Sequence, residues 1–509
     1  MNTSALPSQA AWLWRTATLL FAGALIVRVF AVTATGFDGL YGQDAYAYFD
    51  QAMALRATLL QGIPAPPGFH WPQGYPALVA LMSLAVGGVP IAAQLVSLVM
   101  GSLVAPLTYL VGRKLLPSGG DGAAILAAVL TAIGGQAVLS SIVSMSDATA
   151  LALILLSMWT ALEFATTPRR RCLLALAVVF GCAAVATRWA SILVAPALAV
   201  PALRGLAYGR RLRHIFPALL AAALGSGAVL FTLFHNQAFD LMGYFRNWNL
   251  LNAVWGPIPE IPAGTLSAKA PGLLYYLAPL YHPAFLGPLL GPLAGWGLWR
   301  LWRDNEPYRS LTLVLWAGVP FFFFVGLPLR NLRFCLTNAV PFILLAAWGA
   351  WILLPRPFLG KAIRVVIGLS LALIVAWGAR RIESFTSAAR AIIHTVHSVE
   401  ALVPAHAIVL TFEITQTFEH HSDLQTFELF DQNEATLGML IKGGRPVFLL
   451  TQPDDVIARW QNQAPGINTR WLEDHGSLQE IEAWGLYTLR RFEEHCVHQA
   501  GFPRAEAAS

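Results

Sequence analysis

The stretch from Asp38 to Pro76, DGLYGQDAYAYFDQAMALRATLLQGIPAPPGFHWPQGYP, decides how the rest of the chain is interpreted. It places carboxylates, aromatic rings, a histidine and prolines between two long apolar runs. Polar groups at membrane depth are costly and as a rule functional, and non-helical backbone is tolerated there only when it is buried in protein or lines a watery cavity. We therefore expect the chemistry of this protein in the loop between these apolar runs.

The composition of the whole chain is that of a polytopic membrane protein. Its 509 residues are 56% hydrophobic and only 12% charged, and the mean hydropathy is +0.59. These values exclude an ordinary soluble domain. The first apolar run, near 11–35, is too long for a cleaved signal peptide and lacks a small-residue cleavage pattern, so we expect it to remain as a spanning helix.

A window of about 20 residues predicts about eleven spans before residue 380. Single apolar runs lie at 12–35, 91–115, 122–142, 147–166, 215–236, 277–300, 310–328, 334–354 and 362–379. The run from Cys172 to Leu203 is broken at Arg188 and has basic clusters on both sides, so we interpret it as a hairpin of two short helices. Residues 75–89 are apolar but too short to span, and are predicted as an interfacial or re-entrant helix.

The distribution of basic residues orients these spans. The positive-inside rule places the N-terminus in the cytoplasm, and the 36–76 loop and the C-terminal part of the chain outside. After Arg380 the apolar runs shorten to strand length, as in HAIVLTFEI and RPVFLLT, and alternate with polar helical stretches. The predicted fold is therefore mainly α, a membrane helical bundle over 1–379, followed by a small extracytoplasmic α/β domain over 380–509.

Several motifs follow one another in an order known from one family. QDAYAYFDQAMAL carries a DA-x-x-Y-x-x-x-A pattern, and WPQGYPALVALMSLAVGG has the form of a PPGYP segment with an amphipathic helix after it. YLVGRKLL, VSMSDATALALILL, ATRWASILVAPALAV and RNLRFCLTNAVPF have the forms of Y-L-x-G-R-x-L, S-D-A, T-R-P and R-Y-x-x-x-x-x-P elements. Together they resemble the glycosyltransferase C (GT-C) superfamily, which includes protein O-mannosyltransferases and the aminoarabinose transferase of lipid A, over roughly residues 15–355.

The resemblance implies a multi-pass glycosyltransferase of the bacterial plasma membrane. Such an enzyme moves a hexosyl or pentosyl group from a polyprenyl-phosphate donor to an extracytoplasmic acceptor. A protein hydroxyl, lipid A, a cell-wall glycan or another lipid would all suit the same loop. The expected partners are the donor, the bilayer and this acceptor, with no nucleic acid; the chain has no P-loop, no G-x-G-x-x-G after a strand and no H-E-x-x-H, so nucleotide-sugar binding and metalloprotease chemistry lack support.

The chemistry of this transfer needs a carboxylate and positive charge. Breaking the bond between sugar C1 and a phosphate oxygen releases a weak base, so no general acid is required, but the phosphate needs counter-charge and the acceptor proton needs a base. Asp44 is the predicted base of an inverting single displacement; a solvated loop carboxylate or an ion pair with Arg28 is the alternative. Asp147 is the second predicted catalytic acid, and a helix N-cap or dipole partner is its alternative.

The remaining predicted site residues bind the substrate. Those in the loop, which include the rings that could stack on sugar faces, are Tyr46, Tyr48, His70, Trp71 and Tyr75. Arg330 and Arg333 oppose the positive-inside trend, and a guanidinium pair there fits the lipid phosphate, with snorkelling to headgroups as the alternative. Arg188 has the same two interpretations, phosphate contact or snorkelling. It matches the family's hairpin arginine, and we expect it to cap or pair with the first loop.

A metal site is only partly supported. His70 precedes Trp71 and Pro72 where the aminoarabinose-transferase branch carries an acidic and a basic residue before its prolines. A carboxylate pair for a divalent cation is therefore incomplete in this loop, and a metal site must borrow Asp147 or His70 or be absent.

Three other classes stay open as alternatives. A lipid-linked glycan ligase or polymerase would share this topology and differ chiefly in groove width. A secondary transporter or flippase would show repeated halves and ionisable groups near mid-membrane, whereas here the ionisable residues gather at the outer ends of spans. A nonenzymatic scaffold would leave the grouping of Asp44, Asp147 and Arg330 on one face as a coincidence.

Overall fold

The structure divides the chain into two compact units. The computed structural model describes residues 6–67, 69, 71–117, 119–208, 248–254, 271–304, 307–327, 330–452 and 460–494. The membrane unit comprises Met1–Leu40 and Ala47–Thr386, and the C-terminal unit comprises Tyr41–Tyr46 and Ser387–Ser509. The short segment Tyr41–Tyr46 thus belongs with the far end of the chain.

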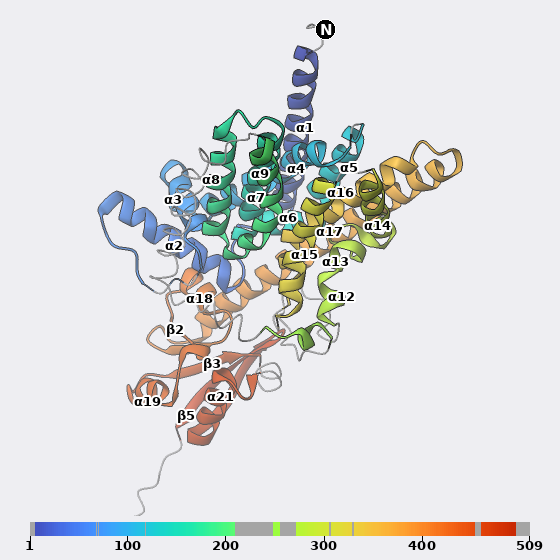
Figure 1. Ribbon diagram of the computed structural model, residues 1–509. Helices are drawn as coiled ribbons and strands as arrows, with labels where there is room; N and C mark the ends of the chain where they lie inside the picture. The colour runs from blue at the N-terminus through green and yellow to red at the C-terminus, as the bar shows by residue number, and fades with distance from the viewer. Residues whose placement is uncertain are drawn as a thin grey trace, which may run out of the picture. The chain divides into compact units, whose positions relative to one another are not determined.

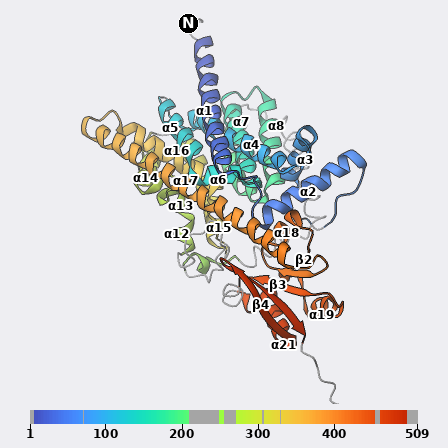
Figure 2. The ribbon, with the colours of Figure 1, turned by 180° about the vertical axis from the view of Figure 1, so that it is seen from behind.

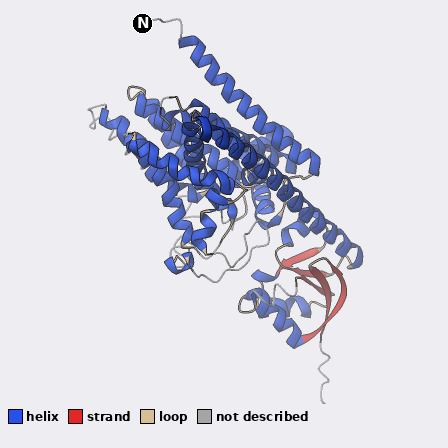
Figure 3. Ribbon diagram, turned by 90° about the vertical axis from the view of Figure 1, so that its right-hand side faces the viewer, coloured by secondary structure: helices blue, strands red, loops and turns tan. Residues whose placement is uncertain are grey.

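The described part of the membrane unit is helical, and the strands all belong to the C-terminal unit (Figures 1 and 3). The α-helices are α1 (Leu6–Thr35), α2 (Gly42–Gln61), α3 (Gly74–Val86), α4 (Pro90–Leu115), α5 (Asp121–Ile133), α6 (Gly135–Ile142), α7 (Ser146–Thr166), α8 (Arg171–Thr187), α9 (Ala195–Tyr208), α12 (Gly272–Tyr276), α13 (Ala278–Tyr281), α14 (Gly287–Arg303), α15 (Pro307–Val325), α16 (Leu336–Leu353) and α17 (Pro357–Leu402). Short 3-10 turns are η2 (Trp189–Val194), η3 (Leu250–Ala253) and η4 (Leu332–Cys335). Helix α2 begins, and helix α17 ends, in the C-terminal unit.

Seven helices in the described part of the chain are long and apolar enough to cross a membrane, or eight if α5 and α6, which meet at a bend of 52°, form one span. These helices make the chain an integral membrane protein. In α4, α7 and α16, 78 to 83% of the most apolar window is buried, whereas in α1 and α17 the value is 22%. An apolar helix is stable when it is enclosed by protein or lipid, so the first three form the centre of the bundle and α1 and α17 lie at its periphery.

The structure differs from the hydropathy prediction of about eleven spans in detail. The predicted span at 215–236 lies outside the described residues. The hairpin predicted over 172–203 is present as α8, η2 and α9, with the break at Arg188. Residues 277–300, predicted as one span, instead form α13 and α14 with a turn at His282, since prolines at 279 and 283 lack the N–H that a continuous helix needs.

The C-terminal unit is a five-stranded mixed sheet with helices on both faces. Its elements after α17 are β1 (Ile408–Thr411), α18 (Thr415–His421), β2 (Gln425–Glu428), η5 (Leu429–Asp431), α19 (Glu434–Lys442), β3 (Val447–Thr451), α21 (Ala464–His475), β4 (Gly476–Trp484) and β5 (Tyr487–Glu494). The strand order is β2-β1-β3-β5-β4. Strand β1 pairs in parallel with β2 and β3, while β5 is antiparallel to β3 and β4.

The strands of this sheet are apolar where both faces are covered. Strands β1 and β3 are buried along their whole length, as expected for parallel strands between two helical layers. On one face Val409 packs with the end of α17 and with Phe418 of α18, and on the other Leu410 packs with Leu437 of α19 and Leu472 of α21. The unit has the α/β composition that strand-length apolar runs predicted.

Helix α17 runs for 46 residues. Figure 2 shows it as one unbroken helix. It passes without a break through the boundary predicted at residue 379, and the division between the two units falls at Thr386. The end of a membrane span and the start of the C-terminal unit are therefore one helix.

Candidate functional site

The predicted base lies at the beginning of α2. Gly42 starts this helix with φ +72°, a left-handed conformation that suits glycine, and the residues after it are mostly good helix formers. Asp44 lies in the first turn, where a carboxylate is favoured by the helix dipole. Because residues four apart share one face of a helix, Asp44 and Tyr48 lie on the same face of α2.

The backbone just before α2 is fixed by the membrane unit. The side-chain amide of Gln94 on α4 donates to the carbonyl of Phe37 at 2.8 Å, and the N–H of Ser144 donates to the carbonyl of Gly39 at 2.8 Å. Gly39 has φ +96°, and a Cβ there would lie 2.7 Å from the Ser144 hydroxyl oxygen, so a larger residue does not fit. The backbone just before α2 is thus hydrogen-bonded to α4 and to the segment that leads into α7.

An aromatic cluster, defined as Tyr48, Phe69, Trp71 and Tyr75, packs beside the start of α7. The Tyr48 ring lies 5.4 to 5.6 Å from the other three ring centroids. Its hydroxyl lies 3.1 Å from Ser146 Oγ, and both residues are buried. Tyr75 is fully buried, whereas Trp71 and Phe69 are half-buried. The partly exposed ring surface of this cluster therefore belongs to Trp71 and to Phe69, and Phe69 is not among the site residues predicted from the sequence.

A charged cluster, defined as Asp147, Arg188 and Arg333, lies next to Ser146. Asp147, 4% exposed, accepts from Arg188 Nη1 at 2.8 Å, and its Oδ2 has no hydrogen-bond partner in the described part of the chain. Met145 occupies the N-cap position of α7 without a side-chain capping bond, and Asp147 lies in the first turn. The predicted partners of Arg188 are a phosphate and the first loop, whereas its ion pair is with Asp147 of α7.

The ring of Phe334 joins the two guanidinium groups of this cluster. The Arg188 guanidinium carbon lies 5.3 Å, and that of Arg333 5.6 Å, from the centre of this ring. Arg333 Nη1 also lies 3.3 Å from the sulfur of Met145, and Asn331 holds the start of η4 by accepting from the Arg333 N–H at 3.0 Å. Two positive charges thus accompany the single carboxylate of Asp147.

Arg330 has a different environment. It is 2% exposed, and its Nη2 donates to the carbonyl of Asn252 in η3 at 2.7 Å. The structure therefore groups Arg188 and Arg333 with Asp147, and ties Arg330 to the backbone of a neighbouring turn.

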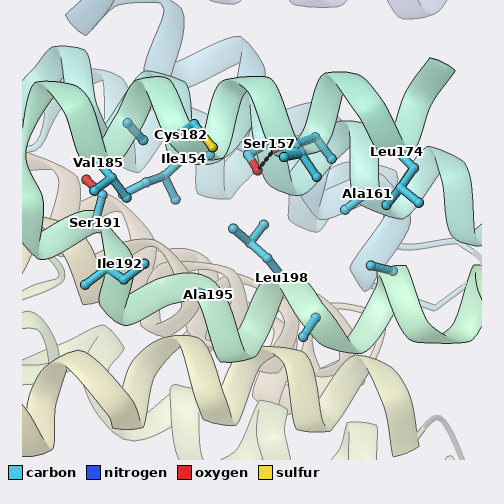
Figure 4. A pocket seen from close by; sticks show the side chains of 16 residues that line it. Ile154, Ser157, Ala161, Leu174, Cys182, Val185, Ser191, Ile192, Ala195 and Leu198 are labelled. Carbon is cyan, nitrogen blue, oxygen red and sulfur yellow. Dashed lines mark hydrogen bonds between the residues drawn. The ribbon is translucent and has the colours of Figure 1, made fainter. Parts of the chain in front are cut away.

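An apolar pocket of about 260 Å³ lies between α7, α8, η2 and α9 (Figure 4). Leu174 and Ala161 line one end of it, and Val185 and Ser191 line the other. The hydroxyl of Ser157 in its wall donates to the carbonyl of Ala177 at 2.7 Å, so the wall presents few polar atoms. Arg188 lies in the chain between the lining residues Val185 and Ser191.

The other predicted substrate-binding tyrosine lies in the C-terminal unit. Tyr46 is 1% exposed, and its hydroxyl lies 3.1 Å from His421 Nε2. Its ring centroid is 5.4 Å from that of His420. Both the ring and the hydroxyl of Tyr46 are thus engaged by α18.

His70 lies outside the described residues, as does most of the loop from Phe239 to Gly272. Among the residues that are described, no group of three or more His, Cys, Asp and Glu side chains is arranged to hold a metal ion. Asp147, the carboxylate that a cation would have to share, is held by Arg188. The described donor set does not fit a metal ion, and no chemical step is assigned to one.

Comparison with solved structures identifies the fold. The chain superimposes on ArnT from Cupriavidus metallidurans bound to undecaprenyl phosphate with a TM-score of 0.59 and 14% identity, over 93% of this chain and 97% of that one. It superimposes on the archaeal oligosaccharyltransferase AglB from Archaeoglobus fulgidus, in complex with an inhibitory peptide and a dolichol-phosphate, with a TM-score of 0.57 and 11% identity, over 94% and 74%. No protein-family model and no curated protein sequence matches the chain. The resemblance predicted from the motifs is confirmed at the level of the fold, which is that of the GT-C glycosyltransferases.

Proposed function

We propose that this protein is a membrane glycosyltransferase that moves a sugar from a polyprenyl-phosphate donor to an acceptor on the extracytoplasmic side. The observation that carries the proposal is the charged cluster at the first turn of α7, where Ser146, the residue before Asp147, bonds with Tyr48 of the aromatic cluster. A sugar linked to a lipid phosphate needs apolar space for the lipid chain, cations for the phosphate and aromatic rings for the sugar. The membrane unit contains one of each: the apolar pocket, the charged cluster and the aromatic cluster.

In the proposed reaction, Arg188 and Arg333 bind the phosphate oxygens of the donor. Their positive charge stabilises the leaving phosphate as the bond between C1 and its oxygen breaks. Asp147 holds Arg188 in place through one oxygen, and its second oxygen accepts a hydroxyl of the donor sugar. The lipid chain extends along the apolar pocket, which contributes affinity in proportion to the apolar area it covers.

Asp44 is the proposed base. An acceptor hydroxyl attacks C1 from the side opposite the phosphate and transfers its proton to the Asp44 carboxylate as the new bond between C1 and oxygen forms. The phosphate leaves with the electron pair of the broken bond, so the configuration at C1 inverts. The assignment rests on the motif to which Asp44 belongs and on its place in the first turn of α2.

A transfer assay tests the proposal. Purified protein is incubated with a panel of synthetic radiolabelled polyprenyl-phosphate sugars and a membrane extract as acceptor, in parallel for wild type, Asp44→Asn and Asp50→Asn. Asp50 is the matched control, because it is an exposed carboxylate on the same helix. Label transferred by wild type and Asp50→Asn but lost in Asp44→Asn supports the function and the base.

The similarity to an oligosaccharyltransferase favours a second candidate, a ligase that moves a whole glycan from a lipid-linked donor. Folded wild-type protein that transfers no monosaccharide from any donor, but transfers an oligosaccharide from a lipid pyrophosphate, would replace the first proposal by the second.

A further inference from the structure

The C-terminal unit holds the first turn of α2 through both ends of the Gln43 amide. Gln43 Nε2 donates to Glu428 Oε2 at 2.6 Å, and Gln43 Oε1 accepts from the backbone N–H of Gln416 at 3.4 Å. Both partners and Gln43 belong to the C-terminal unit. A side-chain amide bound at its donor and its acceptor has one orientation, so Gln43 fixes the backbone that carries it.

The acceptor carboxylate is itself firmly held. Glu428 Oε2 also accepts from the Thr415 hydroxyl at 2.7 Å, and Oε1 accepts from the N–H of Phe430 at 3.3 Å. The backbone of Glu413 contributes a further hydrogen bond, and Glu413 takes a left-handed φ of +65°, a conformation that no other non-glycine residue in the described part of the chain adopts. Strain of this kind persists where the surroundings impose it, commonly at functional positions.

The position of these contacts in the sheet is that of a ligand-binding edge. Thr411 is the last residue of β1 and Glu428 the last of β2, and the two are paired in the parallel register. Open α/β sheets bind their ligands outside the carboxyl ends of the parallel strands. In this chain, Gln43 occupies that edge.

Tyr46 provides a second anchor one turn later. Its hydroxyl bonds with His421 Nε2 at 3.1 Å and its ring packs on His420. Residues three apart share a helix face, so Gln43 and Tyr46 fix the rotation of the first turn about its axis as well as its position. Asp44 lies between them in sequence, on the face that it shares with Tyr48.

We propose that the C-terminal unit positions the base: Gln43 and Tyr46 are positioning residues, and Glu428, Thr415 and His421 are the groups that hold them. This inference rests on the proposed function, since it gives a role to the carboxylate assigned as base there. It gives a catalytic consequence to residues 387–509 of the C-terminal unit, which carry no catalytic group of their own in this mechanism.

A reciprocal exchange of Gln43 and Glu428 tests the proposal. Gln43→Glu places a carboxylate against Glu428 and should lower kcat by about 10- to 100-fold, the range for a misplaced reacting group, with KM for the donor changed less than about threefold. Adding Glu428→Gln restores an amide-to-carboxylate bond in the opposite sense and should recover about tenfold of the lost kcat. Glu434→Gln, at an exposed position on α19, is the matched control and should behave as wild type.

Amide hydrogen exchange of residues 41–49 supplies a readout that does not need activity. Exchange there should rise in Gln43→Glu and return toward wild type in the double variant. Wild-type kcat in Gln43→Glu, or a double variant that is no better than Gln43→Glu in both measurements, would overturn the positioning role. Absence of transfer by wild type, with the exchange pattern intact, would instead overturn the proposed function and leave the anchoring of α2 established.

Discussion

Tyr46 and Tyr48 lie two residues apart on one helix and serve different units. Successive residues turn by about 100° on an α-helix, so these two side chains point to nearly opposite sides. The Tyr46 hydroxyl bonds with His421 of the C-terminal unit, and the Tyr48 hydroxyl bonds with Ser146 of the membrane unit. Both were predicted to stack on sugars, but both are instead almost completely buried against protein. The difference shows that each unit holds its own part of α2 through a tyrosine hydroxyl, and that the two tyrosines are only about half a turn apart.

The largest expected effect concerns the carboxylate beside these anchors. Asp44→Asn should lower kcat for transfer by about 10²–10⁴-fold, the usual contribution of a general base, while KM for the donor changes little. Asp44→Glu should retain part of the activity, because it keeps a base on a longer side chain. Steady-state kinetics on the three proteins would decide the matter: equal rates for Asp44→Asn and wild type would remove Asp44 from the reaction.

The next largest effect is expected for the ion pair next to Ser146, the residue that bonds with Tyr48. Arg188→Ala leaves the Asp147 carboxylate buried without its cation and should destabilise the membrane unit by about 3–5 kcal/mol. Thermal unfolding in detergent measures this change.

A surface ion pair in the same unit is the control for Arg188. Arg113 and Asp121 lie 2.7 Å apart with side chains 30% and 48% exposed, so Arg113→Ala should cost about 1 kcal/mol or less. Equal losses of unfolding free energy for the two substitutions would contradict the view that Asp147 needs Arg188 as its buried counter-charge.

Removing each tyrosine hydroxyl separately tests how much each of the two contacts stabilises its own unit. Tyr48→Phe strands the fully buried Ser146 hydroxyl and should cost about 1–3 kcal/mol, whereas Tyr46→Phe leaves a partly exposed His421 that water can reach and should cost about 0.5–1.5 kcal/mol. Hydrogen exchange should rise in the membrane unit for the first variant and in the C-terminal unit for the second. The reverse pattern would show that the two anchors have been assigned to the wrong units.

The smallest expected effect is a pH dependence of the stability of the C-terminal unit, to which Tyr46 belongs. Burial raises the pKa of Glu428 above its ordinary value of 4.5, although hydrogen bonds from Thr415, Phe430, Gln43 and Glu413 oppose the shift. Because the folded-state pKa is the higher one, the stability that Glu428 contributes is fully present below about pH 4.5 and is lost as the pH rises through the raised value.

The comparison protein for this titration is Glu428→Gln. The unfolding free energy of the C-terminal unit in wild type, relative to that of Glu428→Gln, should fall as the pH rises above 4.5. Parallel pH profiles for the two proteins would show that the pKa of Glu428 is the same in the folded and unfolded chain.

The sequence predicted those features that depend on local pattern. Long apolar runs locate α4, α7 and α16, because a span needs about 20 apolar residues whatever its neighbours are. The hairpin break at Arg188 also followed from local composition. The pairing of Arg188 with Asp147 did not, since the two are distant in sequence and no periodicity links them.

Other features were missed for definable reasons. The charged strand pair β4 and β5 carries little hydrophobic signal, because much of it faces solvent. Phe334 lies within a recognised motif, but its place between two guanidinium groups depends on the fold. The assignment of Tyr41–Tyr46 to the C-terminal unit rests on contacts that single-sequence patterns do not reveal.

The bond between Gln43 and Glu428 joins residues 385 positions apart, and this sets an order of events during synthesis. A ribosome that adds about 5–20 residues per second makes Glu428 roughly 20–80 s after Gln43. A nascent chain therefore completes most of its spans before the group that orients its first loop exists. A product terminated between residues 386 and 428 would carry the whole membrane unit yet lack Glu428, so that transfer activity would report on synthesis of the C-terminal unit.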